Sequence, residues 1–129
     1  MPSYKKLTPN LLVDNVEHSL AFYTGVLGFT QGMTVPDASP LVFAQVTNGS
    51  VEIFLNDAKG AVEEYPMLGG RPLGATATMF IEVEQIEALW ADLQGKATVV
   101  VPFFTQWYGM KEFAIADPDG YLITFAERA

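Results

Sequence analysis

Residues 8–17, with the sequence Thr-Pro-Asn-Leu-Leu-Val-Asp-Asn-Val-Glu, recur in similar form at residues 78–87 as Thr-Met-Phe-Ile-Glu-Val-Glu-Gln-Ile-Glu. The two runs share threonine, valine and glutamate at equivalent positions, and each changes from an apolar strand pattern to a helical one. Self-similarity at a fixed spacing is typical of duplicated structural units. The sequence therefore predicts two copies of one module that begins with a strand and a helix.

Each module continues through its helix into three further strands. An apolar stripe predicts a first helix over residues 15–28, in which Asp14 and Glu17 cap the start and Gly28 marks the end. A second stripe predicts a shorter helix that ends at Gly95. Strand patterns punctuated by turn residues follow the helices, at residues 31–35, 41–47, 51–55, 98–101, 112–116 and 121–126. Each half thus has the order β-α-β-β-β.

This order predicts a single α+β domain over residues 1–129, with helices on the outer face of mixed sheets. The first module covers about residues 5–56 and the second about residues 75–127. The segment between them, residues 57–74, is rich in glycine and proline and reads as a linker with a short helical turn near Val62. A chain of 129 residues is long enough for one hydrophobic core and too short for two independent domains.

Composition argues against several classes of function. Fifteen acidic against seven basic residues give a net charge of −8, which disfavours binding to nucleic acid or to anionic membranes. The absence of cysteine removes disulfides, zinc–thiolate sites and cysteine nucleophiles. No apolar run approaches the roughly 20 residues that span a bilayer, and the N-terminus does not have the pattern of a signal peptide. We therefore expect a cytoplasmic protein with no membrane partner.

Two segments resemble a known superfamily. Residues 13–29, Val-Asp-Asn-Val-Glu-His-Ser-Leu-Ala-Phe-Tyr-Thr-Gly-Val-Leu-Gly-Phe, resemble the first-helix signature of the vicinal-oxygen-chelate superfamily, which includes glyoxalase I, dioxygenases and the bleomycin-resistance proteins. Residues 117–125, Asp-Pro-Asp-Gly-Tyr-Leu-Ile-Thr-Phe, resemble its characteristic turn and final strand. The resemblance extends from about residue 7 to residue 127. It implies two tandem modules whose curved sheets enclose a cavity and, by analogy, a homodimer.

In that superfamily, one side chain from the first strand and one from the last strand of each module point into the cavity. In its enzymes these side chains are typically His or Gln and Glu, which hold a divalent cation. The resemblance places the four positions at Thr8, Glu52, Thr78 and Thr124. Threonine hydroxyls are weak ligands for transition metals, so we expect no metal ion and no other cofactor. The single histidine, His18, falls within the first-helix signature and is expected on the surface.

Glu52 is the one candidate for proton transfer. Strand alternation separates it from the apolar residues on either side of it and so turns it toward the cavity. Three roles stay open there. Desolvation would raise its pKa and make it a base, a cationic group of a ligand would pair with its charge, or Thr8, Asn10 or Thr124 would hydrogen-bond it and fix the sheet.

Residues 102–113, Pro-Phe-Phe-Thr-Gln-Trp-Tyr-Gly-Met-Lys-Glu-Phe, place five aromatic residues on a predicted loop that leads into a strand. This segment resembles the bleomycin-resistance-like members of the superfamily, as does Pro9 in the first strand. The resemblance implies sequestration of a drug, without modification, in an acidic, aromatic-lined groove at a dimer interface. Stacking on aromatic rings and attraction to acidic groups suffice for such binding.

The sequence therefore favours a small-molecule-binding protein that sequesters a planar or partly apolar ligand, neutral or cationic, without a metal. The residues expected to contact the ligand, with Lys111 at the rim, are Thr8, Asn10, Glu52, Phe54, Thr78, Phe80, Trp107, Tyr108, Lys111 and Thr124. Two alternatives stay open. One is a lyase, isomerase or dioxygenase-like enzyme that uses Glu52 as a base or as part of a divalent-metal site, and the other is an interaction module without a ligand.

Overall fold

The structure, a computed structural model, describes residues 2–74 and 76–129. The first module consists of β1, α1, a π-helical turn η1, β2, β3 and β4, with the bounds Asn10–Val13, Val16–Ala21, Phe22–Val26, Thr30–Val35, Phe43–Asn48 and Val51–Asp57. The second consists of β5, α3, β6, β7 and β8, with the bounds Thr78–Glu82, Ile86–Leu93, Thr98–Thr105, Met110–Ala116 and Leu122–Arg128. Helix α2 (Ala58–Glu64) and the 3-10 turn η2 (Pro66–Leu68) lie between the modules. Among these described residues, no helix has the length and apolar character needed to cross a bilayer.

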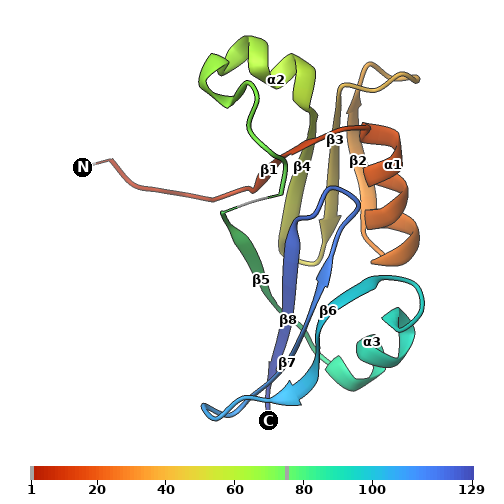
Figure 1. Ribbon diagram of the computed structural model, residues 1–129, viewed down its shortest axis with the longest axis vertical. Coiled ribbons are helices and arrows are strands. Elements are labelled where there is room, and N and C mark those ends of the chain that lie inside the picture. The colour runs from red at the N-terminus through yellow and green to blue at the C-terminus, as the bar shows by residue number, and fades with distance from the viewer. Residues whose placement is uncertain (1, 75) are drawn as a thin grey trace.

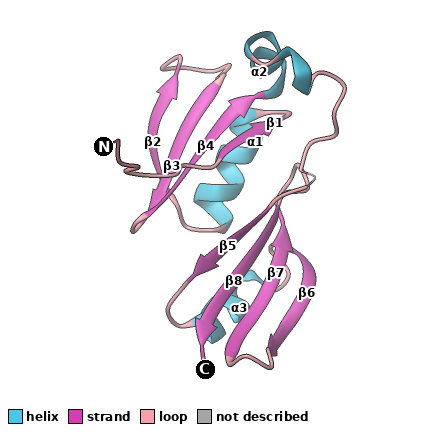
Figure 2. Ribbon diagram, turned by 90° about the vertical axis from the view of Figure 1, so that its left-hand side faces the viewer, coloured by secondary structure: helices cyan, strands magenta, loops and turns pink. Residues whose placement is uncertain are grey.

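Each module forms one four-stranded mixed sheet, in the order β1-β4-β3-β2 or β5-β8-β7-β6. The first and last strands of a module pair in parallel, and the other neighbours are antiparallel. Helices α1 and α3 cover the corresponding faces of the two sheets (Figure 1). The opposite face of each sheet, called the open face from here on, is turned to the same side of the molecule in both modules (Figure 2). The predicted α+β class and the β-α-β-β-β order of both halves are confirmed.

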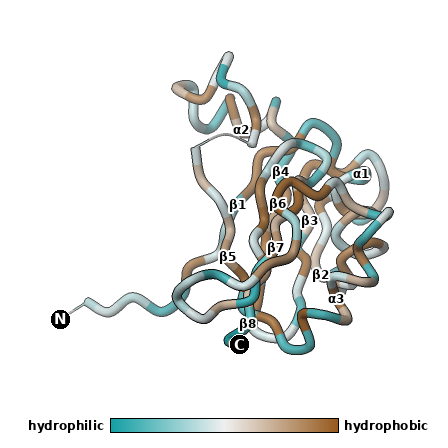
Figure 3. Tube along the Cα trace, turned by 60° about the horizontal axis from the view of Figure 1, so that its bottom comes forward, coloured by the Kyte–Doolittle hydropathy of each residue, from teal (hydrophilic) through white to brown (hydrophobic). Residues whose placement is uncertain are grey.

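Strand alternation separates the core from the open faces. Side chains that point toward the helices are buried, as Ile53 and Leu55 are in β4 and Ile123 and Phe125 in β8. Hydrophobic residues are accordingly concentrated along the strands, whereas hydrophilic residues gather in turns and at the C-terminus (Figure 3). The alternate residues point to the open faces; they include Gln45, Glu52 and Phe54 in the first sheet and Phe80, Glu112, Ala114 and Thr124 in the second.

Helices α1 and α3 begin with different caps. Asn15 caps α1, because its side chain accepts a hydrogen bond from the backbone N–H of His18 at 2.9 Å. The predicted cap at Asp14 is therefore wrong by one residue. At the start of α3, Gln85 has a left-handed φ of 58° and supplies no side-chain cap. Glu127, at the end of β8, instead accepts two backbone N–H groups there, which ties this helix to the last strand.

Two segments predicted as loops are partly regular structure. Strand β6 extends to Thr105 and β7 begins at Met110, so the aromatic segment at residues 102–113 is mostly a hairpin rather than a loop. Phe103, Phe104 and Thr105 have a high strand propensity, which explains the extension of β6. The linker at residues 57–74 contains the whole of α2, whereas only one helical turn was predicted.

Polar contacts join the two modules. Tyr23, on η1, is fully buried and donates a hydrogen bond of 2.7 Å to Asp117 in the turn between β7 and β8. Ser19 of α1 donates to Asp119 of the same turn at 3.1 Å. The hydroxyl of Tyr121 donates to a backbone carbonyl of β1 at 2.7 Å. Burial raises the pKa of Tyr23, so that its hydroxyl stays a neutral donor.

Tyr23→Phe is expected to destabilise the fold by about 1–3 kcal/mol, because the buried carboxylate of Asp117 loses this donor. Urea denaturation followed by circular dichroism measures the change in the free energy of unfolding. Tyr65→Phe is a suitable control, since Tyr65 is 44% exposed and its substitution should change that free energy by less than about 0.5 kcal/mol. Equal stability of the two variants would contradict the role assigned to the Tyr23 hydroxyl.

Candidate functional site

Glu52 lies on the first open face and accepts hydrogen bonds from three side chains. Thr8 Oγ1 donates to it at 2.8 Å and Gln45 Nε2 at 2.5 Å. The ammonium group of Lys6 lies 2.6 Å from Glu52 Oε1. Lys6 belongs to the extended arm that precedes β1 and crosses in front of this sheet (Figure 2). As a result, the Glu52 side chain is only 12% exposed although it stands on an open face.

These donors lower the pKa of Glu52 to about 2. The hydrogen bond from Lys6 has the largest effect, followed by those from Gln45 and Thr8, while desolvation acts in the opposite direction. A carboxylate with this pKa is ionised at neutral pH and is a weak base. Of the roles left open by the sequence, the hydrogen bond with Thr8 is confirmed and the raised pKa is wrong. Asn10 is not a partner of Glu52, since it accepts a hydrogen bond from an asparagine side chain of β4.

Gln45 and Lys6 are site residues that the sequence analysis missed. Besides its bond to the carboxylate, the side chain of Gln45 accepts the backbone N–H of Met33 at 3.1 Å. Gly32 makes room for it, because a Cβ atom there would lie 2.6 Å from Gln45 Oε1. The register of the β3–β4 hairpin makes Gln45 a diagonal neighbour of Glu52 on the same face. The sequence Asn48-Gly49, which is typical of a tight hairpin turn, could have indicated this contact.

The positions implied by the resemblance are paired differently in the two sheets. In the first sheet Thr8 lies beside Glu52. In the second sheet the residue paired with Thr78 is Leu122. By strand pairing, Leu122 is therefore the counterpart of Glu52, and Thr124 lies opposite Phe80 on the same face. The reason is that pairing with β5, and not spacing along β8, fixes the register.

This donor set does not fit a metal ion. The three threonine hydroxyls and the one carboxylate provide a single strong ligand, and the aliphatic Leu122 beside Thr78 adds none, whereas transition-metal sites use three or four. The carboxylate, moreover, is already held by Lys6 and two neutral donors. Across residues 2–74 and 76–129, no three His, Cys, Asp or Glu side chains are grouped so as to hold a metal.

Glu112 is a second carboxylate on an open face, and the sequence analysis did not select it. Its side chain accepts the hydroxyl of Tyr108 at 2.7 Å and the amide of Gln106 at 3.5 Å, and the residue is only 6% exposed. Because Phe113 and Ile115 are buried on the other side of the sheet, alternation along β7 puts Glu112 on the open face. The predicted strand at residues 112–116 has the same alternation, so the sequence alone could have placed Glu112 on the open face.

The remaining predicted ligand residues do not gather in one place. Phe80 and Thr124 are paired on the second open face. Trp107 is 92% exposed in the turn between β6 and β7, and its ring lies edge-to-face with that of Tyr108, with centroids 5.3 Å apart. The side chain of Lys111 turns away from the open face, because its ammonium group lies 2.8 Å from a glutamate of α3. The structure thus places Lys111 on the helix side of β7 and not at the rim.

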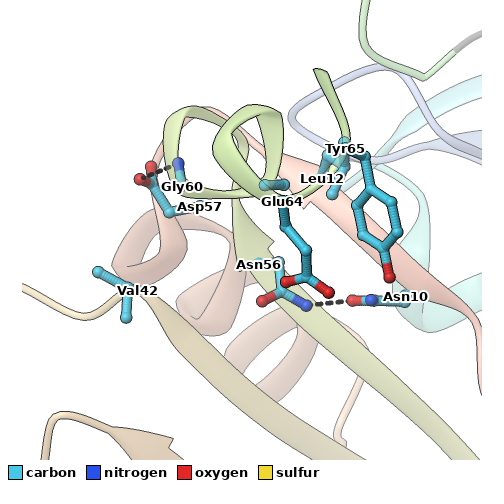
Figure 4. Close-up of a pocket in the computed structure, with 9 residues that line it drawn as sticks. Asn10, Leu12, Val42, Asn56, Asp57, Gly60, Glu64 and Tyr65 are labelled. Atoms are coloured by element: carbon cyan, nitrogen blue, oxygen red, sulfur yellow. Dashed lines mark hydrogen bonds between the residues drawn. The ribbon is translucent and has the colours of Figure 1, made fainter. Parts of the chain in front are cut away.

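Hollows of different size lie beside these faces. One of 360 Å³ lies between β1 and β5, has a mostly apolar wall that includes Asn10 and Thr78, and is large enough for a small organic molecule. A smaller one of 170 Å³ lies between α2 and the first sheet, where Asn10 and Asn56 are hydrogen-bonded to each other beside Glu64 and Tyr65 (Figure 4). A third, of 570 Å³, lies between the β3–β4 turn and the start of α3, and no predicted ligand residue lines it.

Lys6→Met is expected to raise the pKa of Glu52 toward its ordinary value, because the substitution removes the donor with the largest effect. NMR measurement of the Glu52 carboxyl carbon during an acid titration reports this pKa directly. Lys59→Met, at an exposed position of α2, removes the same charge and should leave the pKa of Glu52 unchanged.

Comparison of Lys6→Met with the wild type also tests how much Glu52 contributes to the stability of the fold in acid. Its pKa is about 2 in the folded protein against an ordinary value of 4.5, so its interactions stabilise the fold fully above pH 4.5 and are lost as the pH falls through about 2. Lys6→Met should therefore unfold at a higher pH than the wild type in an acid titration followed by circular dichroism. An identical acid midpoint would show that the ion pair contributes nothing.

Comparison with known proteins assigns this architecture to a family. The sequence matches the family described as the Glyoxalase/Bleomycin resistance protein/Dioxygenase superfamily over residues 7–125. It is also 30% identical over 129 residues to the bleomycin resistance protein of Geobacillus stearothermophilus, and the match covers 93% of this chain and 94% of that protein.

Two solved structures have the same fold. A glyoxalase/bleomycin resistance protein/dioxygenase from Nocardioides superposes with a TM-score of 0.80 at 22% sequence identity, covering 99% of this chain and 86% of that one. TnmS3 from Streptomyces sp. CB03234, described as an antibiotic binding protein, superposes with a TM-score of 0.75 at 20% identity, covering 100% of this chain and 99% of that one. The family match over residues 7–125 and the 30% identical relative establish that the chain belongs to the glyoxalase/bleomycin resistance protein/dioxygenase superfamily.

Proposed function

We propose that this protein binds an organic small molecule and sequesters it unchanged, without a metal ion. The ligand is planar or partly apolar, and neutral or cationic. The observation that carries the proposal is the donor chemistry at the four positions where the enzymes of the superfamily hold their cation. The resemblance puts Thr8, Glu52, Thr78 and Thr124 at these positions, and they offer one strong ligand between them.

The same residues give little support to acid–base chemistry. An efficient general base has a pKa near the working pH, whereas that of Glu52 is about 2. Three donors also occupy the carboxylate oxygens of Glu52. His18 is exposed on α1, on the face of the sheet opposite to the open one. Binding without turnover is therefore the function that these side chains serve best.

Aromatic and apolar side chains on the open faces supply contacts for a planar ligand. Phe54 lies edge-to-face with Phe43 on the first open face, with ring centroids 5.0 Å apart. On the second open face Phe80 is 55% exposed, and Leu122 beside it is partly exposed. Exposed rings of this kind stack favourably on flat organic molecules. The hollow between β1 and β5 adjoins Leu122 and offers an apolar wall.

The names of the relatives agree with this function and suggest a class of ligand. The protein from Geobacillus stearothermophilus is a bleomycin resistance protein, and TnmS3 is described as an antibiotic binding protein. We therefore propose that the ligand is an antibiotic-like compound, held in the cytoplasm. Bleomycin is the first compound to test.

We further propose that two copies of the chain form a homodimer in which each open face is completed by the partner. The support is the amount of apolar surface that a single chain leaves exposed, since Phe80, Phe104 and Leu7 are 55%, 40% and 89% exposed. Size-exclusion chromatography with light scattering is expected to give twice the 14.1 kDa of one chain. A mass of 14.1 kDa at micromolar concentration would contradict the dimer.

Isothermal titration calorimetry with bleomycin and a panel of planar aromatic antibiotics is expected to show saturable binding. Phe54→Ala should weaken this binding by roughly tenfold, because an aromatic contact contributes about 0.5–1.5 kcal/mol beyond the buried area. Met67→Ala serves as the control, since Met67 is 68% exposed on η2 and outside the open faces.

Elemental analysis of the purified protein separates sequestration from metal-dependent catalysis. One equivalent of a transition metal that co-purifies with the wild type and disappears in Glu52→Gln would overturn the proposal. Chemical change of the compound during the titration would do the same. No response to any compound would favour an interaction module without a ligand.

A further inference from the structure

We propose that Glu112, on the open face of the second sheet, is the residue that recognises a cationic group of the ligand. The inference rests on the proposed binding function and deepens it, because it assigns the positive charge of the ligand to one side chain of one module. From the sequence alone, Glu52 is the candidate for this role. The contacts of the two carboxylates decide between them.

The two carboxylates differ in how their charge is balanced. Glu52 is paired with Lys6 at 2.6 Å. Among residues 2–74 and 76–129 there are three ion pairs, and none of them includes Glu112. Lys111, its neighbour in the sequence, is paired with Glu87 on the helix side of the sheet. Glu52 therefore has its counter-charge within the chain, whereas Glu112 has only neutral partners.

Burial makes this difference significant. Glu112 is 6% exposed, and its hydrogen-bond partners are the hydroxyl of Tyr108 at 2.7 Å and the amide of Gln106 at 3.5 Å. A carboxylate has about four lone-pair sites, so these two bonds leave acceptor capacity unused. A buried charge without a counter-ion is unfavourable. A bound cation would remove this penalty at Glu112, whereas at Glu52 it would first have to displace a lysine.

The surroundings of Glu112 suit an organic cation with an aromatic body. Phe104 pairs with Glu112 across β6 and β7, so both side chains lie on the open face. Phe104 is 40% exposed and Tyr108 is 44% exposed. Ala126, which pairs with Glu112 on the other flank, carries only a methyl group. Aromatic rings beside a carboxylate attract ammonium and amidinium groups through both charge and the ring quadrupole.

Two probes of matched shape test the assignment, 9-aminoacridine as a planar cation and acridine as its neutral analogue, both at pH 8. Calorimetry is expected to show that Glu112→Gln weakens the binding of 9-aminoacridine about tenfold or more, because a charge-assisted contact is lost. Acridine should change by less than about twofold. Glu87→Gln removes the same charge on the other side of the sheet and should change both affinities by less than about twofold.

Side-chain amides report on the two carboxylates separately in the wild-type protein. Gln106 contacts Glu112, and Gln45 contacts Glu52. In ¹⁵N-resolved NMR spectra, 9-aminoacridine is expected to shift the amide resonances of Gln106 and to leave those of Gln45 in place. This measurement decides the assignment even where Glu112→Gln does not fold. A shift confined to Gln45 would overturn it.

The outcomes also separate this inference from the proposed function. If acridine binds the wild type as tightly as 9-aminoacridine, or if Glu112→Gln weakens both probes equally or neither of them, the assignment of the cation to Glu112 fails and the binding function stands. If neither probe nor bleomycin binds the wild type, the binding function fails and this inference fails with it.

Discussion

The buried hydrogen bond from Tyr23 to Asp117 fixes how the two modules lie against each other. It joins the end of the first helix to the turn before β8, and neither residue is more than 5% exposed. Tyr121 adds a second connection, since its hydroxyl both accepts from and donates to the backbone of β1. Directional bonds in a low-dielectric interior specify orientation more strictly than apolar packing does. Both open faces are turned to the same side of the molecule because this junction holds them there (Figure 2).

The duplicated modules have kept a common backbone and differ in charge. In the first module, the N-terminal arm places Lys6 beside Glu52. The charge of this carboxylate is balanced by the lysine, and its pKa is about 2. In the second, the position paired with Thr78 is the aliphatic Leu122, and the carboxylate stands two strands away from β5, on β7. Two similar sheets thus present different chemistry to the same side of the molecule. A ligand that contacts both faces would meet Glu52 with its lysine partner and Glu112 with two neutral hydrogen-bond partners.

Local periodicity predicted the fold and part of the site. Alternation turned Glu52 to the open face, because alternation is a property of the strand itself, whereas Thr8 was placed by the resemblance. Lys6 was missed since its arm has no periodic pattern, and only a tertiary contact defines its position. Glu112 was missed because the positions implied by the resemblance lie on the first and last strands of each module, whereas β7 is an inner strand. Lys111 was expected at the rim, although alternation along β7 turns it to α3.

A glycine at the edge of the first sheet sets the position of a side chain that hydrogen-bonds Glu52. Gly32 lies on β2, the edge strand of the sheet, and any Cβ atom there would lie within 2.6 Å of the Gln45 amide. A bulkier residue would force that amide aside and deprive Glu52 of one of the donors that keep it acidic. A substitution at position 32 would therefore change the proton affinity of Glu52 indirectly, although none of the residues that contact Glu52 is replaced.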